Sequence, residues 1–346
     1  MPTDTLDQRL LALTMTEKRA AMHKPTKRIA ITDSPVSFVE KILALTNDRY
    51  DFEITKDKNA DYVFFSVDGY EVLKYDGVRI FVTGENVTPN FAIADYAMAF
   101  EKLSFGDRYI WFPLIRLYHE AYDSLRMPRV PAEDIMSQKT DFCSYVMSNT
   151  KNSAEERVRI FDLLSDYKQV NSGGKWRNNV GGPVIDKNAF QARHKFAITF
   201  ENSSSIGYLT EKFAQAAMVD AIPIYWGDPE VGKIFNTRAF INCHDFPSLG
   251  EAVEYVKRVD QDDRLYREIL REPWFQSGVE PACLKEDAFS AFLTNIFEQE
   301  LPSAYRRNRS RWGMKIERRL YDMYHRPHVH GLNLLRKNWR EFWHKR

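Results

Sequence analysis

The stretch from Lys195 to Phe246 constrains the fold of this chain more than any other part of the sequence. Continuous apolar and β-branched residues at 196–200 and 222–226 are typical of strands that are buried on both faces of a sheet. Between them an apolar stripe at i, i+4, i+7 and i+8 indicates a helix: Leu209, Phe213, Ala216 and Ala217. The stretch therefore predicts a βαβ unit, followed by a third strand that ends at Cys243.

Polar residues follow the first of these strands and open the helix. In an open parallel sheet, ligands bind beyond the carboxyl ends of the strands, so these side chains are expected to border a crevice. Thr210 suits the N-cap position, and the helix start offers free N–H groups and a partial positive charge to an anion. Lys212 adds a full charge, while Glu211 can accept hydrogen bonds from sugar hydroxyls. This combination suits a nucleotide sugar, in which a diphosphate and a ribose lie side by side.

The same residues carry a resemblance to a known family. The segments FENSSSIGYLTEKFAQAAMVDAIPIYWG and VGKIFNTRAFINCHDF resemble the donor-binding signature of the α-1,3/4-fucosyltransferases, glycosyltransferase family 10, especially the bacterial Helicobacter-type enzymes. The resemblance implies that Asn202, Tyr208 and Glu211 contact the donor. Two alternatives stay open: Tyr208 can simply pack the loop, and the neighbouring Glu201 can be a structural acceptor for backbone N–H groups.

Strand and helix patterns also alternate elsewhere, which predicts parallel sheets covered by helices on both faces. The resemblance implies a GT-B fold, in which two Rossmann-like, doubly wound α/β domains face each other across a cleft; the alternation alone also fits other two-domain α/β enzymes. We divide the chain into a lead-in helix at 1–26, an acceptor-side domain with its linker at 27–140, a donor-binding domain at 141–300 and a basic amphipathic tail at 301–346.

Length and composition favour a reduced, globular protein. The 346 residues suffice for two domains, and 44% of them are hydrophobic. The three cysteines are an odd number without metal-type spacing, so we expect no disulfide framework. We find no pattern of a signal peptide or a spanning helix. Most histidines are isolated, and the cluster His325, His328 and His330 lies among arginines, so we expect no metal site there.

A glycine-rich, basic loop at 172–182 is a second candidate for anion binding. Glycines let a backbone approach an anion, and Arg177 offers a planar fork for two phosphate oxygens. The alternative is a flexible surface loop with solvated charges. The family resemblance implies the clamp, in which Arg177 and Lys212 stabilise the departing nucleotide diphosphate. Because two cations can replace a metal in this task and we find no suitably placed Asp-x-Asp, we expect no required cofactor, with Mn²⁺ at most stimulatory.

The reaction also needs a base that takes the proton of the acceptor hydroxyl. Glu85 directly follows an apolar strand pattern at 78–83, which places it at the carboxyl end of the N-terminal sheet. A cap for a helix after Pro89, or a solvated turn residue, is the alternative role. The segment FVTGENVTPNFAIADYAMAF resembles the part of the bacterial fucosyltransferases that carries the proposed base, so Glu85 is our candidate. Asp95 is a weaker candidate and is interpreted as a helix-face residue.

The C-terminal tail has its own charge pattern. Residues 301–346 hold thirteen Lys and Arg against three acidic residues, a net charge of +10 that leaves −9 for residues 1–300. Ile316, Leu320, Met323 and Tyr324 share one helical face, and a second set follows Pro327: Leu335, Trp339, Phe342 and Trp343. Basic amphipathic helices with Trp lie at anionic membrane surfaces. Packing of the tail on the protein is the alternative; nucleic-acid binding lacks a recognisable fold.

Together these features predict an inverting α-1,3-fucosyltransferase. We expect it to move L-fucose from GDP-fucose to a galactose-β-1,4-N-acetylglucosamine acceptor, giving a Lewis-type glycan such as that of lipopolysaccharide O-antigen. Glu85, Arg177 and Lys212 would be catalytic. We expect a cytoplasmic protein, peripheral on the inner face of a bacterial membrane. A GT-B transferase for another nucleotide sugar and a non-catalytic, membrane-associated sugar-binding protein remain the alternatives.

Overall fold

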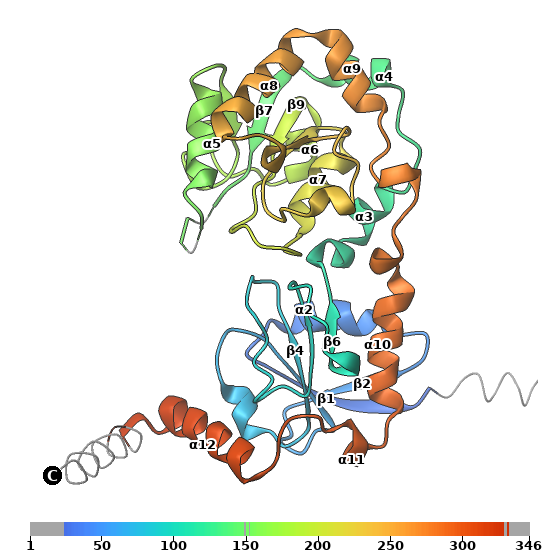
Figure 1. Cartoon of the computed structure of the whole chain (residues 1–346), viewed down its shortest axis with the longest axis vertical. Coiled ribbons are helices and arrows are strands. Elements are labelled where there is room, and N and C mark those ends of the chain that lie inside the picture. The colour runs from blue at the N-terminus through green and yellow to red at the C-terminus, as the bar shows by residue number, and fades with distance from the viewer. Residues whose placement is uncertain (1–23, 149, 152, 329–330, 332–346) are drawn as a thin grey trace, which may run out of the picture. The chain divides into compact units, whose positions relative to one another are not determined.

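The computed structural model describes residues 24–148, 150–151, 153–328 and 331 (Figure 1). Contacts divide the chain into two units. The first consists of the chain up to Val82, Pro89–Ala97 and the chain from Ser290 onward, and the second consists of Thr83–Thr88 and Met98–Phe289. The expected lead-in helix lies almost wholly outside the described residues, as do Leu335, Trp339, Phe342 and Trp343 of the tail.

A six-stranded sheet is built mostly from strands of the first unit. Its order is β2-β1-β3-β4-β5-β6, and the pairs β1–β2, β1–β3 and β3–β4 are parallel. All four residues of β3 and all five of β4 are buried, as expected for central strands of a covered sheet. The bounds are β1 (Thr26–Thr32), β2 (Asp51–Thr55), β3 (Tyr62–Phe65), β4 (Val78–Val82), β5 (Tyr96–Ala99) and β6 (Tyr109–Trp111), with helix α2 (Val36–Leu43) after β1.

The segment after Pro89 corrects a prediction. A helix with Asp95 on its face was expected there, but the chain forms strand β5, and Asp95 is completely buried just before it. Its carboxylate accepts hydrogen bonds from the backbone N–H groups of Arg79, Arg306 and Arg307 at 2.7 to 2.8 Å. Asp95 is therefore held by backbone and side-chain donors within the first unit.

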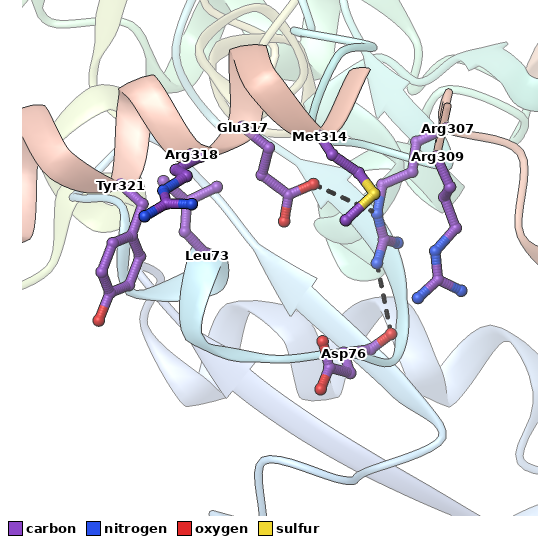
Figure 2. A pocket seen from close by; sticks show the side chains of 8 residues that line it. All are labelled: Leu73, Asp76, Arg307, Arg309, Met314, Glu317, Arg318 and Tyr321. Carbon is purple, nitrogen blue, oxygen red and sulfur yellow. Dashed lines mark hydrogen bonds and ion pairs between the residues drawn. The ribbon is translucent and has the colours of Figure 1, made fainter. Parts of the chain in front are cut away.

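The C-terminal segment completes the first unit. Arg307 pairs with the buried Asp95, and Glu317 of helix α12 (Arg311–His325) pairs with the buried Arg79 at 2.7 Å. Tyr324 stacks on Tyr70 with ring centroids 3.7 Å apart. A hollow of about 350 Å³ remains beside α12 (Figure 2), and its lining is mostly charged: Leu73, Asp76, Arg307, Arg309, Met314, Glu317, Arg318 and Tyr321. The other helices of the segment are α10 (Glu286–Glu298) and α11 (Leu301–Ala304).

The second unit contains a doubly wound parallel sheet with the order β11-β10-β9-β7-β8. β7, the first strand of this sheet in the sequence, lies between β8 and β9, so the winding direction reverses between β7 and β9. Ligands of such sheets bind beyond the carboxyl ends of the strands at this reversal. The bounds are β7 (Asp141–Tyr145), β8 (Val170–Ser172), β9 (His194–Ile198), β10 (Ile222–Tyr225) and β11 (Ile241–Asn242).

Helices of the second unit lie around this sheet (Figure 1), and their buried apolar side chains share clusters with those of its strands. Helices α5, α6 and α7 alternate with the strands of this sheet along the sequence, and two short helices, α3 and α4, precede β7. The bounds are α3 (His119–Ser124), α4 (Ala132–Gln138), α5 (Glu156–Ser165), α6 (Lys187–Ala192), α7 (Glu211–Met218), α8 (Leu249–Gln261) and α9 (Asp263–Arg271).

Candidate active site

A buried ionic cluster lies between the end of β9 and the start of α7. The Glu201 carboxylate is fully buried and accepts a 2.8 Å hydrogen bond from Lys212 Nζ. The Thr210 hydroxyl lies beside both groups, 2.7 Å from Glu201 Oε2 and 3.0 Å from Lys212 Nζ, and Thr210 N–H donates to Glu201 Oε1 at 2.8 Å. Glu201 is therefore a structural acceptor for a backbone N–H group, which is the alternative role that the sequence allowed for it.

Lys212 keeps its charge in this cluster. Burial lowers the pKa of Lys212, but the neighbouring Glu201 and Glu211 carboxylates more than offset this, and its pKa lies above the ordinary value. Its side chain is still 22% exposed, whereas that of Glu201 is not exposed at all. The cation is therefore held by Glu201, while part of the Lys212 side chain is open to solvent.

Local sequence explains why the cluster can form. Gly227 follows β10, and a Cβ at this position would lie 2.5 Å from Glu201 Cγ and 2.7 Å from the Tyr225 hydroxyl. Only glycine leaves room for the carboxylate. Thr210 occupies the N-cap position of α7 as predicted, but its hydroxyl makes no capping bond, because it is engaged by Glu201 and Lys212.

Arg157 of α5 is a cation that the sequence analysis missed. Its guanidinium is 5% exposed and donates to Asn202 Oδ1 at 2.9 Å and to Ser153 Oγ at 2.8 Å. Burial raises the pKa of Tyr145, while Arg157 and Lys212 both act to lower it, so both charges act on the same hydroxyl. Because α5 follows β7 and Asn202 follows β9, Arg157 lies at the reversal point of the sheet. A signal was present: Arg157 shares the buried stripe of Ile160, Phe161 and Leu164.

Arg177 lies apart from the Glu201–Lys212 cluster in this structure. It follows the edge strand β8, two strand positions and about 10 Å from β9. Its guanidinium pairs with Asp162 of α5 and stacks on Trp176 at 4.6 Å, with its side chain 48% exposed. The structure does not bring Arg177 together with Lys212, and a donor contact of Arg177 remains a prediction that requires the Asp162 pair to open.

Glu85 lies in a tight turn that belongs to the second unit. The Thr83 hydroxyl accepts a hydrogen bond from Glu85 N–H at 2.9 Å and lies 3.0 Å from Glu85 O. In the described part of the chain, the Glu85 carboxylate has no hydrogen-bond or ion-pair partner, and the residue is exposed. Its negative charge acts on the hydroxyl of Tyr208, whose pKa is raised by burial, by Glu201 and by Glu85. An accessible carboxylate therefore lies near the loop after β9.

Tyr208 and Gly207 fix the end of that loop. Gly207 has φ of +90°, and a Cβ there would lie 2.1 Å from Phe100 O, so glycine is required. Its carbonyl accepts a 2.9 Å hydrogen bond from Trp111 Nε1. Tyr208 is only 1% exposed, and its ring meets Phe100 edge-on at 4.7 Å. This geometry supports the packing alternative for Tyr208.

Lys187 is a second cation that the sequence analysis missed. Helix α6 runs back toward the start of β9, so its first residue lies at the carboxyl end of the sheet, where Lys187 Nζ donates to Gln215 Oε1 of α7 at 2.6 Å. Burial lowers the pKa of Lys187 to about 8, although the nearby Glu211 and Glu201 act to raise it. The cluster around Glu211 therefore contains a lysine whose proton is weakly held.

Other residues considered from the sequence have structural contacts. His244 Nε2 accepts from Gly227 N–H at 3.3 Å, and His194 is completely buried against Phe190. Within the described ranges, no group of three or more His, Cys, Asp or Glu residues is arranged to hold a metal ion. The described helices include none with the length and apolar character needed to cross a membrane.

Two family profiles match the chain. The profile described as "Alpha-(1,3)-fucosyltransferase FucT N-terminal domain" matches residues 32–118, and "Glycosyltransferase family 10 (fucosyltransferase) C-term" matches residues 136–280. Alpha-(1,3)-fucosyltransferase FucT of Helicobacter pylori is 33% identical over 297 residues, which are 74% of this chain and 62% of the relative. Alpha-(1,3)-fucosyltransferase 4 of Bos taurus is 29% identical over 192 residues, 52% and 46% of the two chains.

Solved structures agree with this grouping. A crystal structure of an alpha1,3-fucosyltransferase with GDP matches with a TM-score of 0.71 and 29% identity, covering 83% of this chain and 94% of that one. The structure with GDP-fucose matches with a TM-score of 0.69 and 30% identity, covering 81% and 93%.

The doubly wound sheet with a polar site at its reversal point is the architecture of a nucleotide-binding α/β protein. With the profile and structure matches, the assignment is more specific: the chain belongs to glycosyltransferase family 10, the fucosyltransferase family. It spans less than two thirds of the length of the curated relatives named above.

Proposed function

We propose that this protein is an inverting α-1,3-fucosyltransferase that moves L-fucose from GDP-fucose to a galactose-β-1,4-N-acetylglucosamine acceptor. The observation that carries the proposal is the Glu201–Thr210–Lys212 cluster, which fixes an accessible cation at the reversal point of the second sheet. The matched relatives support it, because their names specify alpha1,3-fucosyltransferases and two of the solved structures contain GDP or GDP-fucose.

Charge develops at both ends of the breaking bond in such a transfer. The sugar ring becomes oxocarbenium-like, and the departing diphosphate gains negative charge. Lys212 stabilises the phosphates as they leave, with Arg157 as a second cation, and Arg177 joins them if its pair with Asp162 opens. Glu211 holds the ribose hydroxyls, while Asn202 and Tyr208 hold the donor or the loop that surrounds it. Cations perform the electrostatic task, so we propose that no metal is required and that a chelator leaves substantial activity.

Glu85 takes the proton of the acceptor hydroxyl. Its carboxylate is exposed, and its negative charge contributes to the raised pKa of the Tyr208 hydroxyl. A carboxylate with no partner in the described part of the chain is available to a substrate. General-base catalysis contributes about 10²- to 10⁴-fold to a rate.

A GT-B fold belongs to the same proposal. So does a peripheral membrane location, with the protein cytoplasmic on the inner face of a bacterial membrane. Helix α12 carries exposed apolar side chains beside its arginines, with Trp312 70% and Met314 62% exposed. This supports an amphipathic surface on the described part of the basic tail.

A turnover assay with GDP-fucose and N-acetyllactosamine tests the function directly. We expect fucosylated product from the wild type, and about 10²- to 10⁴-fold less from Glu85→Gln with GDP affinity kept. Glu53→Gln, a change at an exposed acid of β2, serves as the control and should keep full activity. Absence of turnover in the wild type, or tighter binding of UDP than GDP, would overturn the assignment.

A further inference from the structure

The side chain of Asn86 connects two loops that are far apart in the sequence. Its Nδ2 donates to Ser203 Oγ at 2.8 Å, and its Oδ1 accepts from Ser205 Oγ at 3.0 Å. The amide is planar and both of its ends are engaged, so the two bonds fix its orientation as well as its position. Asn86 therefore joins the turn at 83–88 to the polar loop after β9.

Each of the two loops also has hydrogen bonds of its own. In the turn, the buried Thr83 holds the backbone N–H of Glu85, and Val87 N–H donates to Glu85 O at 2.9 Å. In the polar loop, Ser204 Oγ donates to Gly227 O at 2.7 Å. A displacement of the polar loop therefore moves Asn86, and with it the adjacent Glu85.

We infer that Asn86 is a positioning residue that sets the Glu85 carboxylate against the donor site through the Ser203–Ser205 loop. This inference rests on the proposed function, since it gives Asn86 a role in proton removal from the acceptor. Catalysis depends steeply on such placement, and an error of about 1 Å costs on the order of 100-fold in rate. Asn86 touches neither Lys212 nor Arg157 in the structure, so donor affinity should depend on it little.

Three variants separate this role from general stabilisation. Asn86→Ala removes the connection from one side, Ser203→Ala with Ser205→Ala removes it from the other, and the triple variant removes both. We expect kcat to fall about 10- to 100-fold in each, with the GDP dissociation constant changed less than about twofold. Because all three remove the same connection, the loss in the triple variant should equal the loss in Asn86→Ala.

A matched control comes from Asn90, whose Oδ1 accepts only the local Ala92 N–H at 3.0 Å. Asn90→Ala should leave kcat unchanged. Hydrogen exchange provides a readout that does not depend on activity: backbone amides at 203–208 should exchange faster in Asn86→Ala than in the wild type, with the melting temperature kept.

The outcomes are distinguishable. If the wild type does not transfer fucose, the proposed function fails and the coupling to Glu85 fails with it. If the wild type is active and Asn86→Ala keeps its kcat, or if the losses in Asn86 and in the two serines multiply in the triple variant, only the coupling is wrong. A weakening of GDP binding that accounts for the whole loss would also overturn it, because Asn86 would then act on the donor rather than on the base.

Discussion

At the scale of single residues, the pairing of Glu201 with Lys212 makes the site both stable and hard to dissect. Removing one partner of a buried pair leaves the other charge unpaired, which costs about 3–5 kcal/mol. Lys212→Met should therefore lower the melting temperature by on the order of 10 °C, in addition to weakening GDP binding about 10- to 100-fold through a lost charged hydrogen bond.

The double variant Glu201→Gln with Lys212→Met separates the two effects. Glutamine keeps acceptor capacity for Thr210 without a charge, so most of the melting temperature should return while GDP binding stays weak. Differential scanning calorimetry and GDP titration measure the two quantities. Recovery of GDP binding together with stability would show that Lys212 acts only on the fold.

Lys187 gives the site a dependence on pH. Burial lowers its pKa to about 8, so its charge is present below pH 8 and is lost as pH rises through that value. The charged groups that act on it are Glu211, Lys212 and Glu201, and its Nζ is bonded to Gln215. We expect GDP affinity to fall between about pH 7 and 9 in the wild type and to fall less in Lys187→Arg, because arginine stays charged throughout this range.

A matched control for this prediction is Lys139, whose pKa burial also lowers to about 8. It donates to Ala192 O and Val219 O ahead of β7, at the opposite end of the sheet. Lys139→Arg should leave the pH profile of GDP binding unchanged. An equal effect of both substitutions would show that the profile follows the stability of the unit rather than the charge at the site.

Residue roles were only partly predictable from the sequence. Glu85 and Asn202 were predicted because they follow strands with clear patterns, and Glu211 and Lys212 because they open a helix with an apolar stripe; their roles stay predictions. Arg157 and Lys187 lie in helices. A role for them depends on which face of the helix is buried and which loop that face contacts, and the sequence does not specify either. The role of Arg177 stays a prediction: a glycine-rich basic loop indicates an anion site, and in the structure this arginine follows an edge strand and pairs with Asp162 of α5.

At the scale of elements, buried strands were predictable and the segment at 90–99 was not. Its apolar run at 91–94 is interrupted by Asp95, and a charged residue contradicts the expectation for a buried position. The structure explains the exception, because Asp95 accepts hydrogen bonds from Arg79, Arg306 and Arg307, two of which lie more than 200 residues away. No local pattern contains that information.

This contact changes what a truncation of the tail should do. Deleting residues 305–346 would remove three of the bonds to Asp95, those from Arg306 N and Arg307 N and the Arg307 ion pair. We expect a loss of about 3–5 kcal/mol in stability, since a buried charge loses its partner. Deleting residues 329–346 keeps all of these bonds and should leave the melting temperature of the protein within about 1 °C. Thermal unfolding of both variants checks this, and equal stability would contradict the structural role of Arg307.

At the scale of the whole molecule, the charge separation between the tail and the rest of the chain suits an anionic surface. Residues 329–346 contain five Lys and Arg against one acid. Basic residues near an anionic membrane contribute about 1 kcal/mol each. The 329–346 deletion should therefore sediment less with phosphatidylserine vesicles than the full chain, and raised salt should weaken binding of the full chain. Turnover with soluble acceptor should be unchanged. Equal sedimentation of both proteins would reject the membrane role of the tail.

The central claim is that a nucleotide diphosphate binds where the second sheet reverses its winding, between β7 and β9. A crystal structure of the protein with GDP tests it most directly. We predict phosphate oxygens within hydrogen-bond distance of Lys212 Nζ and the ribose beside Glu211. GDP bound away from Lys212, for instance only at the loop that follows β8, would contradict the account.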